Sequence, residues 1–264
     1  ILDNAIYANF NTLRVWGGGI YEPDEFYQLC DEKGILVWQD FMFACSMYPG
    51  DQGFLDSVKK EITYQVKRLK HHPSIALWCG NNEIASGWLS WGWKEELPAS
   101  VWDGYKKLFH ELLPDVCARV DPSRLYWPSS PGHDIAQPEI DQIYGRGDNH
   151  YWGVWHGGDD FDAFENNIGR FISEYGMQSF PEVGTIEKFS RKKDLSLTSK
   201  VFEGHQKSSL CNGNVLKYID EYYTRRKDFS KTVSLSQVMQ AQAIRSAVES
   251  HRRNMPFCMG TLYW

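Results

Sequence analysis

Residues 74–83 read Ser74-Ile-Ala-Leu-Trp-Cys-Gly-Asn-Asn-Glu83, an apolar run that passes directly into two amides and a carboxylate. A short apolar run without polar alternation is typical of a strand buried on both faces, as in parallel sheets. Burying two amides and a carboxylate at the end of that strand is costly unless they are paired or reach water. The stretch therefore indicates either a functional site or the capped start of a helix, for which Asn and Glu are equally suited.

A second apolar run ends in the same way. Arg170-Phe-Ile-Ser-Glu-Tyr-Gly176 carries a predicted strand into Glu174. Taken alone, Glu174 is equally consistent with a salt bridge at the end of a strand. Taken together, Glu83 and Glu174 are two carboxylates at the carboxyl ends of predicted parallel strands. Such a pair can hydrolyse a glycosidic bond, because one carboxyl group protonates the leaving oxygen while the other attacks the anomeric carbon.

The rest of the chain alternates between short apolar runs and amphipathic patterns. The apolar runs predict strands at 12–16, 35–38, 75–79, 125–127, 171–172 and 259–264, with 148–152 as a weaker candidate. The amphipathic patterns predict helices at 23–33, 54–70, 102–118 and 234–251. Short connections between the two kinds of segment imply parallel strands, in either a doubly wound open sheet or a closed barrel. The glycine cluster Gly17-Gly18-Gly19 lacks the spacing of a dinucleotide site. Polar residues recur at strand ends, which favours the barrel.

Composition excludes several classes of protein. A length of 264 residues fits one large domain, and 42% hydrophobic residues exclude a disordered chain. A net charge of −6 argues against a nucleic-acid surface. The sequence has no apolar run long enough to insert into a membrane. Eleven tryptophans and fourteen tyrosines suit either core packing or a sugar-binding cleft. Six cysteines without a Cys-x-x-Cys spacing predict mostly buried free thiols.

Five motifs in order resemble glycoside hydrolase family 2. The stretches at 78–83 (Trp-Cys-Gly-Asn-Asn-Glu) and 173–176 (Ser-Glu-Tyr-Gly) resemble its acid/base and nucleophile motifs. The stretches at 14–22 (Arg-Val-Trp-Gly-Gly-Gly-Ile-Tyr-Glu) and 37–43 (Val-Trp-Gln-Asp-Phe-Met-Phe) resemble its β-mannosidase branch. The stretch at 259–264 resembles the start of the last barrel strand. The resemblance covers almost the whole chain and is weakest at 188–231.

The resemblance implies an α/β fold of the (β/α)8 TIM-barrel type and retaining, exo-acting hydrolysis of terminal, non-reducing β-D-mannose. It makes Glu83 the general acid/base and Glu174 the nucleophile. Arg14 would orient Glu174 and keep it ionised, because a nearby cation lowers the pKa of a carboxyl group. Asn82 would bind the sugar 2-hydroxyl group, and Asp40 is a weaker candidate for a hydroxyl contact. The further substrate-binding residues implied are Trp16, Trp91, Tyr151 and Trp264.

Several of these assignments have alternatives. Trp16 and Trp264 could instead be core rings that cap the barrel. Trp91 is one of three tryptophans within residues 88–93 that could face the sugar. In the weaker strand candidate at 148–152, the side chain that points inward could be that of His150, Tyr151 or Trp152. The same barrel could also serve an endo-β-mannosidase, an exo-β-glucosaminidase or a carbohydrate-binding protein without catalysis.

The expected partner is a β-mannoside oligosaccharide or glycan, with no nucleic acid and no membrane insertion. We expect no metal or organic cofactor, because the two carboxylates supply both the acid and the nucleophile. The motifs account for barrel strands 2 to 8, and we expect residues 188–231 to form an excursion between strands 7 and 8. We therefore expect residues 1–264 to be an incomplete barrel within a larger enzyme. A barrel that lacks one strand exposes two sheet edges, which favours poor solubility, inactivity or self-association of this piece alone.

Overall fold

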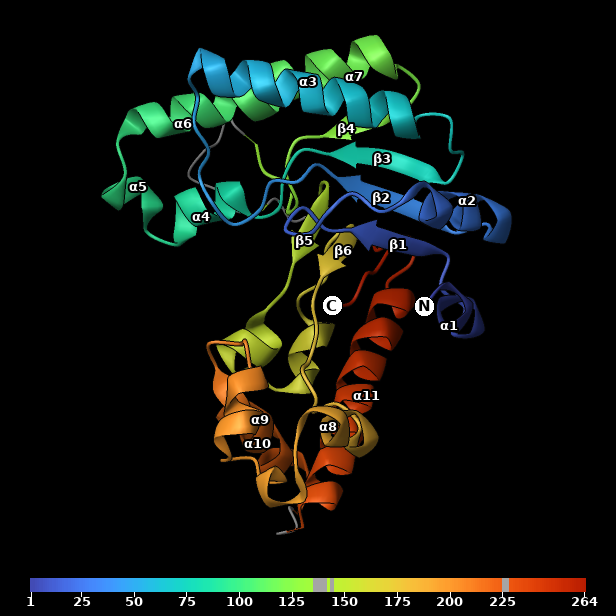
Figure 1. Cartoon of the computed structure of the whole chain (residues 1–264), viewed down its shortest axis with the longest axis vertical. Coiled ribbons are helices and arrows are strands. Elements are labelled where there is room, and N and C mark those ends of the chain that lie inside the picture. Colours follow the sequence, from blue (N-terminus) through green and yellow to red (C-terminus); the bar gives the residue numbers. More distant parts are fainter. Residues whose placement is uncertain (135–141, 143–144, 225–227) are drawn as a thin grey trace. The chain divides into compact units, whose positions relative to one another are not determined.

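The structure, a computed structural model, describes residues 1–134, 142, 145–224 and 228–264 (Figure 1). The chain divides into two compact units, Ile1–His150 and Tyr151–Trp264, named here the N-terminal unit and the C-terminal unit. In the described part of the chain, no helix combines the length and the apolar character needed to cross a lipid bilayer.

The N-terminal unit is built on a parallel sheet with the strand order β1-β2-β3-β4. Its strands are β1 (Thr12–Val15), β2 (Leu36–Asp40), β3 (Ile75–Cys79) and β4 (Leu125–Trp127). All four coincide with predicted strands to within two residues. The register places Arg14 opposite Trp38 and Gln39 opposite Trp78. Because all four strands run in the same direction, their carboxyl ends lie along one edge of the sheet.

The helices of the N-terminal unit are α1 (Leu2–Tyr7), α2 (Asp24–Lys33), α3 (Gln52–Leu69), α4 (Ile84–Ser90), α5 (Trp93–Glu96), α6 (Ala99–Lys106), the π-helical η1 (Lys107–Leu112) and α7 (Leu113–Val120). Three helical regions match predicted patterns, namely α2, α3 and the region of α6, η1 and α7, whereas α1, α4 and α5 were not predicted. Helix α2 ends at Gly34 in a left-handed conformation (φ 69°). Helix α3 begins earlier than predicted because the Asp51 side chain accepts from the Phe54 N–H at 3.0 Å. Helices α3, α6 and α7 lie on one side of the sheet (Figure 1). β5 (Asp148–His150) ends this unit.

The C-terminal unit contains β6 (Phe171–Glu174) and a set of helices. These are η2 (Gly153–Gly157), η3 (Phe161–Glu165), α8 (Val183–Phe189), η4 (Lys192–Asp194), α9 (Lys200–His205), α10 (Cys211–Tyr222) and α11 (Phe229–Arg253). The described part of the predicted excursion, 188–231, therefore holds the end of α8, all of η4, α9 and α10, and the start of α11, while 225–227 lie outside the described residues. A single core of buried side chains, including Tyr175, Tyr218 and Met239, joins these elements.

Residues 259–264, predicted as a strand, run parallel to β6 but form only an isolated bridge, between Ile172 and Thr261. Backbone hydrogen bonds flank the bridge: the Ile172 N–H donates to the Gly260 carbonyl at 3.0 Å, and the Leu262 N–H donates to the Ile172 carbonyl at 2.8 Å. A Cβ atom at Gly260 would lie 2.0 Å from the Phe171 ring. Glycine is thus required for this close approach.

Candidate active site

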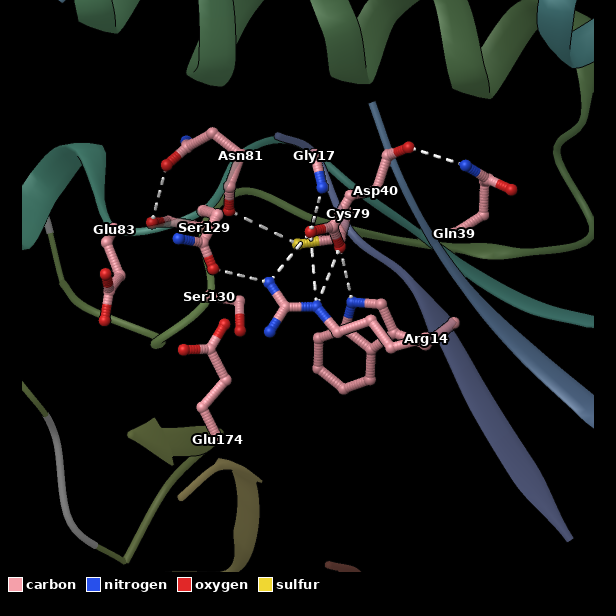
Figure 2. A network of polar contacts seen from close by, with 12 residues as sticks. Arg14, Gly17, Gln39, Asp40, Cys79, Asn81, Glu83, Ser129, Ser130 and Glu174 are labelled. Atoms are coloured by element: carbon pink, nitrogen blue, oxygen red, sulfur yellow. Dashed lines mark hydrogen bonds and ion pairs between the residues drawn. The ribbon is translucent and has the colours of Figure 1, made fainter. Parts of the chain in front are cut away.

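The loops that follow β2, β3 and β4 are held side by side beyond the ends of the strands. The Asn82 N–H donates to the Phe43 carbonyl at 2.9 Å, and the Cys45 N–H donates to the Asn82 carbonyl at 3.0 Å. On the other side, the Glu83 N–H donates to the Ser130 carbonyl at 2.8 Å. These bonds extend the parallel pairing beyond the strands and set Cys45, Glu83 and Ser130 on adjacent segments of the chain; Figure 2 shows Glu83 and Ser130.

Glu83 occupies a backbone conformation that non-glycine residues rarely adopt. Its φ is 57°, in the left-handed region, and it immediately precedes α4. Such a conformation costs of order 1–3 kcal/mol and is common at active sites. The helix start is capped instead by Asn81, whose Oδ1 accepts from the Ile84 N–H at 3.2 Å. The capping interpretation of this stretch is therefore correct for Asn81, which leaves the Glu83 carboxyl group available for another role.

The Glu83 carboxyl group contacts two side chains of the N-terminal unit. Its Oε1 lies 2.8 Å from Nδ1 of His150, and its Oε2 lies 3.8 Å from Sγ of Cys45. The side chain is 16% exposed, so the group retains access to solvent. Burial raises the pKa of Glu83, but the hydrogen bond and charge of His150 outweigh it, with a smaller contribution from Arg14, and the net pKa is lowered. Glu83 in this state suits a base, and it must gain a proton before it can act as an acid.

A buried ion pair holds Arg14 at the carboxyl edge of the sheet. Arg14 Nη2 lies 2.8 Å from Asp40 Oδ2, and the side chains are only 5% and 0% exposed. Asp40 also accepts from the Gly17 N–H at 3.0 Å (Figure 2), and from the Trp38 indole N–H at 2.9 Å. Asp40, the weaker candidate for a sugar contact, is thus fully buried and holds Arg14 in place.

Arg14 also fixes the orientation of Asn82. Its Nη2 donates to Asn82 Oδ1 at 2.8 Å, and the Asn82 amide nitrogen donates toward Cys45 Sγ at 3.4 Å. A guanidinium group has donors only, so it requires the amide oxygen on its own side. The amide N–H₂ group is left to donate in the other direction, as recognition of a sugar hydroxyl oxygen requires.

The Trp16-Gly-Gly-Gly stretch has a steric explanation in this structure. A Cβ atom on Gly17 would lie 2.6 Å from the Phe43 carbonyl oxygen, and one on Gly18 would lie 2.0 Å from the Trp16 ring. The first glycine lets the backbone approach the segment after β2, and the second leaves room for the half-buried tryptophan ring. The motif therefore serves packing at the edge of the sheet.

In the C-terminal unit, Glu174 ends β6 with only 4% of its surface exposed. Its Oε2 accepts from the Trp152 indole N–H at 3.3 Å, and its backbone carbonyl accepts from the Tyr151 N–H at 2.8 Å. The Tyr151 hydroxyl group donates to Asp159 at 2.6 Å, and its ring packs against Phe164. Of the residues that compete for the inward direction, Trp152 thus reaches the Glu174 carboxylate, while His150 reaches Glu83 in the N-terminal unit.

The remaining predicted substrate contacts are exposed rings. Trp91 is 46% exposed and meets Trp93 edge to face, whereas Trp88 is buried and stacks on Trp102. Among the three tryptophans of residues 88–93, Trp91 is therefore the most accessible. Trp264 is 53% exposed, with its backbone N–H donating to the Tyr175 carbonyl at 2.8 Å. The alternative of a core ring does not apply to Trp264 within its own unit.

Among the five cysteines whose side chains the structure describes, four behave as predicted and one does not. Cys30, Cys79, Cys117 and Cys258 are buried free thiols, but Cys45 is exposed beside Glu83. Its φ of 47° is left-handed as well. The sequence gives no signal for this placement, which depends on the pairing of the loops after β2 and β3.

Comparisons with known proteins can be set beside this geometry. No protein-family model matches the chain. The β-mannosidase of Rattus norvegicus is 39% identical over 288 residues, an alignment that covers 100% of this chain and 32% of that protein. The crystal structure of a β-D-mannosidase from Dictyoglomus thermophilum is 44% identical with a TM-score of 0.91, over 100% of this chain and 32% of that one. The chain is homologous to a segment of the β-mannosidases.

The predicted resemblance of the chain to the β-mannosidases is thereby confirmed, and the fold is an α/β fold with parallel strands. The chain spans about a third of the length of the curated β-mannosidases it matches. The exo-chitosanase of Amycolatopsis orientalis covers 100% of the chain with a TM-score of 0.67, over 31% of its own length, but at 17% identity it shares the fold alone.

Three buried polar residues near Glu83 were not predicted from the sequence in the roles that the structure gives them. They are Ser130, Asp148 and, as a partner of Glu83, His150. All three are at least 96% buried. The available signal was the stretch 148–150, Asp-Asn-His, because a strand made wholly of polar residues that are all buried requires a dedicated set of hydrogen bonds.

Proposed function

We propose that this chain is the catalytic part of a retaining exo-β-mannosidase that removes terminal, non-reducing β-D-mannose. In this proposal β1 to β6 are strands 2 to 7 of a (β/α)8 barrel, residues 259–264 are strand 8, and 188–231 is an excursion between strands 7 and 8. The first strand and further domains belong to other parts of a longer protein. The homology to β-mannosidases over the whole chain supports this assignment.

The observation that carries the proposal is the setting of Glu83. It follows β3 in a left-handed conformation, retains access to solvent and shares a hydrogen bond with an imidazole group. A carboxylate that served only to cap the helix would accept from the first backbone N–H groups of α4, and Asn81 already caps α4. The group is thus placed to exchange a proton with a bound ligand.

The proposed reaction has two displacements. In the first, protonated Glu83 gives its proton to the glycosidic oxygen while Glu174 attacks the anomeric carbon, so that the bond to the leaving group breaks and a mannosyl ester forms. In the second, Glu83 as a carboxylate takes a proton from water, whose oxygen attacks the same carbon and releases Glu174. The configuration at the anomeric carbon is retained. The two carboxyl groups must then lie about 5–5.5 Å apart in the active enzyme.

Arg14 and Asn82 have supporting roles in this reaction. Arg14, fixed by Asp40, would provide the positive charge that keeps Glu174 ionised, and Asn82 would donate to the 2-hydroxyl group. Trp16, Trp91, Tyr151 and Trp264 would shape the mannose pocket. The reaction requires no metal or organic cofactor, because Glu83 and Glu174 together provide the acid, the base and the nucleophile.

Azide rescue separates the two carboxylates. In the enzyme that contains this chain, Glu83→Ala should retain activity on 2,4-dinitrophenyl β-mannoside, whose leaving group needs no proton, and azide should yield the β-mannosyl azide. Glu174→Ala should yield the α-mannosyl azide, because azide then replaces the nucleophile. The opposite products would reverse the assignment, and faster wild-type turnover of the aryl β-glucosaminide or of internal mannan linkages would replace the proposed substrate class.

A further inference from the structure

Behind Glu83 lies a continuous chain of buried hydrogen bonds that the proposed reaction does not yet use. Glu83 Oε1 lies 2.8 Å from His150 Nδ1, and His150 Nε2 lies 2.9 Å from Ser130 Oγ. Ser130 Oγ in turn donates to Asp148 Oδ2 at 2.6 Å, and the Trp127 indole N–H donates to Asp148 Oδ1 at 2.7 Å. All five residues belong to the N-terminal unit.

The direction of these hydrogen bonds fixes the tautomer of His150. The single hydroxyl proton of Ser130 is directed at Asp148, so its oxygen can only accept from His150. His150 Nε2 must therefore carry a hydrogen. A single proton then lies between His150 Nδ1 and Glu83 Oε1, and it is bound either to the imidazole nitrogen or to the carboxyl oxygen.

We infer that His150, locked by Ser130 and Asp148, is a positioning residue that shares one proton with Glu83 and so sets the pH range over which Glu83 can act as an acid. This rests on the role proposed for Glu83. When the proton lies on Oε1, Glu83 is the acid and His150 is neutral. After the proton leaves with the aglycone, Glu83 is a carboxylate beside a neutral imidazole and can accept a proton from water.

The consequence for pH dependence follows from the two groups acting as a pair. An isolated glutamate holds its proton only up to about pH 4.3, whereas an imidazole group holds one to about pH 6.5. A strongly coupled pair loses its proton in one macroscopic step that belongs to both groups. Because the hydrogen bond and charge of His150 lower the pKa of Glu83, whereas burial alone would raise it, His150 moves the loss of the acid form of Glu83 to lower pH than burial alone would give.

Other charged groups face the pair from neighbouring elements. Among the described residues of the N-terminal unit, Arg14 on β1 and Cys45 after β2 act on Glu83, and Asp148 acts on His150 through Ser130. Arg14 stabilises the carboxylate form, and the Cys45 thiol is a weak donor to it. Neither the Arg14 guanidinium group nor the Cys45 thiol can replace the His150 imidazole as the group that shares a proton with Glu83.

The test is the pH dependence of kcat/KM for an aryl β-mannoside with a poor leaving group. His150→Asn keeps a donor near the position of Nδ1 but cannot carry the shared proton or its charge, so burial should raise the pKa of Glu83 and the alkaline limb should move to higher pH by about one unit. Ser130→Ala should move the limb in the same direction, and it keeps the backbone carbonyl that accepts from Glu83. His71→Asn, at an exposed histidine of the same unit, is the matched control and should leave the profile unchanged.

A second measurement separates this inference from the proposed function. In protein labelled with nitrogen-15 histidine, the His150 imidazole should show the Nε2–H tautomer, and Glu83→Gln should move its titration to lower pH. If the wild type shows this coupling but does not hydrolyse β-mannosides, the proposed function is wrong, whereas the inference that Glu83 and His150 share a proton stands. An unchanged alkaline limb in His150→Asn, or a His150 titration that ignores Glu83→Gln, would overturn the inference.

Discussion

Replacing Asp40 by Asn should destabilise the protein strongly, because the change leaves the Arg14 guanidinium buried without a counter-charge. The two side chains are 5% and 0% exposed, and Asp40 accepts from three different donor groups. Removing one partner of such a pair costs about 3–5 kcal/mol. Asn82 Oδ1 remains as an acceptor for Arg14, but the new amide N–H₂ group must face at least one of the existing donors. We therefore expect a loss of about 4 kcal/mol in the free energy of unfolding.

Urea unfolding followed by tryptophan fluorescence measures this loss. If the free energy of unfolding falls by about 2–3 kcal/mol per molar urea (the m-value), the urea midpoint of unfolding should fall by about 1–2 M. The matched control is Asp103→Asn, which removes the exposed ion pair with Lys106 and should leave the midpoint unchanged. A loss below about 1 kcal/mol for Asp40→Asn would refute the reasoning, since it would mean that Arg14 finds water or another partner at no cost.

Three further predictions concern single side chains. Iodoacetamide should inactivate the enzyme by alkylating the exposed Cys45 beside Glu83, and Cys45→Ser should resist the reagent; equal sensitivity of the variant would assign inactivation elsewhere. Gly17→Ala should lower the melting temperature and cost about 2–3 kcal/mol, because its Cβ atom would meet a backbone carbonyl at 2.6 Å, whereas Gly184→Ala in α8, with open space around its Cβ atom, should not. Trp152→Phe removes a donor to Glu174, which favours the protonated carboxyl group, so the acidic limb of kcat/KM should move to higher pH; a shift to lower pH would contradict this role.

The framework of the N-terminal unit could be predicted from the sequence because each element carries its own signal. The run 75–79 is apolar throughout, and the stripe Val58, Ile62, Val66 and Leu69 has the helical period, so strand and helix follow from local pattern alone. Glu83 and Glu174 were found because a carboxylate directly after an apolar strand is conspicuous. Both were then strengthened by their family motifs.

The partners of these carboxylates could not be predicted in the same way. His150 meets Glu83 across 67 positions of sequence, and Asp40 meets Arg14 across 26. Such pairs depend on strand order and register, which no local pattern encodes. Asp40 was offered as a contact to sugar because a polar residue at a strand end can face either the ligand or its neighbours. Tyr151 was taken from the family resemblance, and which of its neighbours faces the Glu174 carboxylate could not be read from the sequence, because adjacent residues of a strand point to opposite faces.

Backbone hydrogen bonds continue past β2, β3 and β4, so the position of the main chain at this site does not depend on the side chains that surround Glu83. The main chain at Glu83 is anchored through its own N–H group to Ser130, and the main chain at Asn82 is anchored on both of its polar atoms. Side chains at 45 and 130 can therefore change without moving the carbon atoms that carry the acid. Variation at these two positions should tune reactivity while the scaffold stays fixed, which makes them suitable starting points for redirecting the enzyme by laboratory evolution.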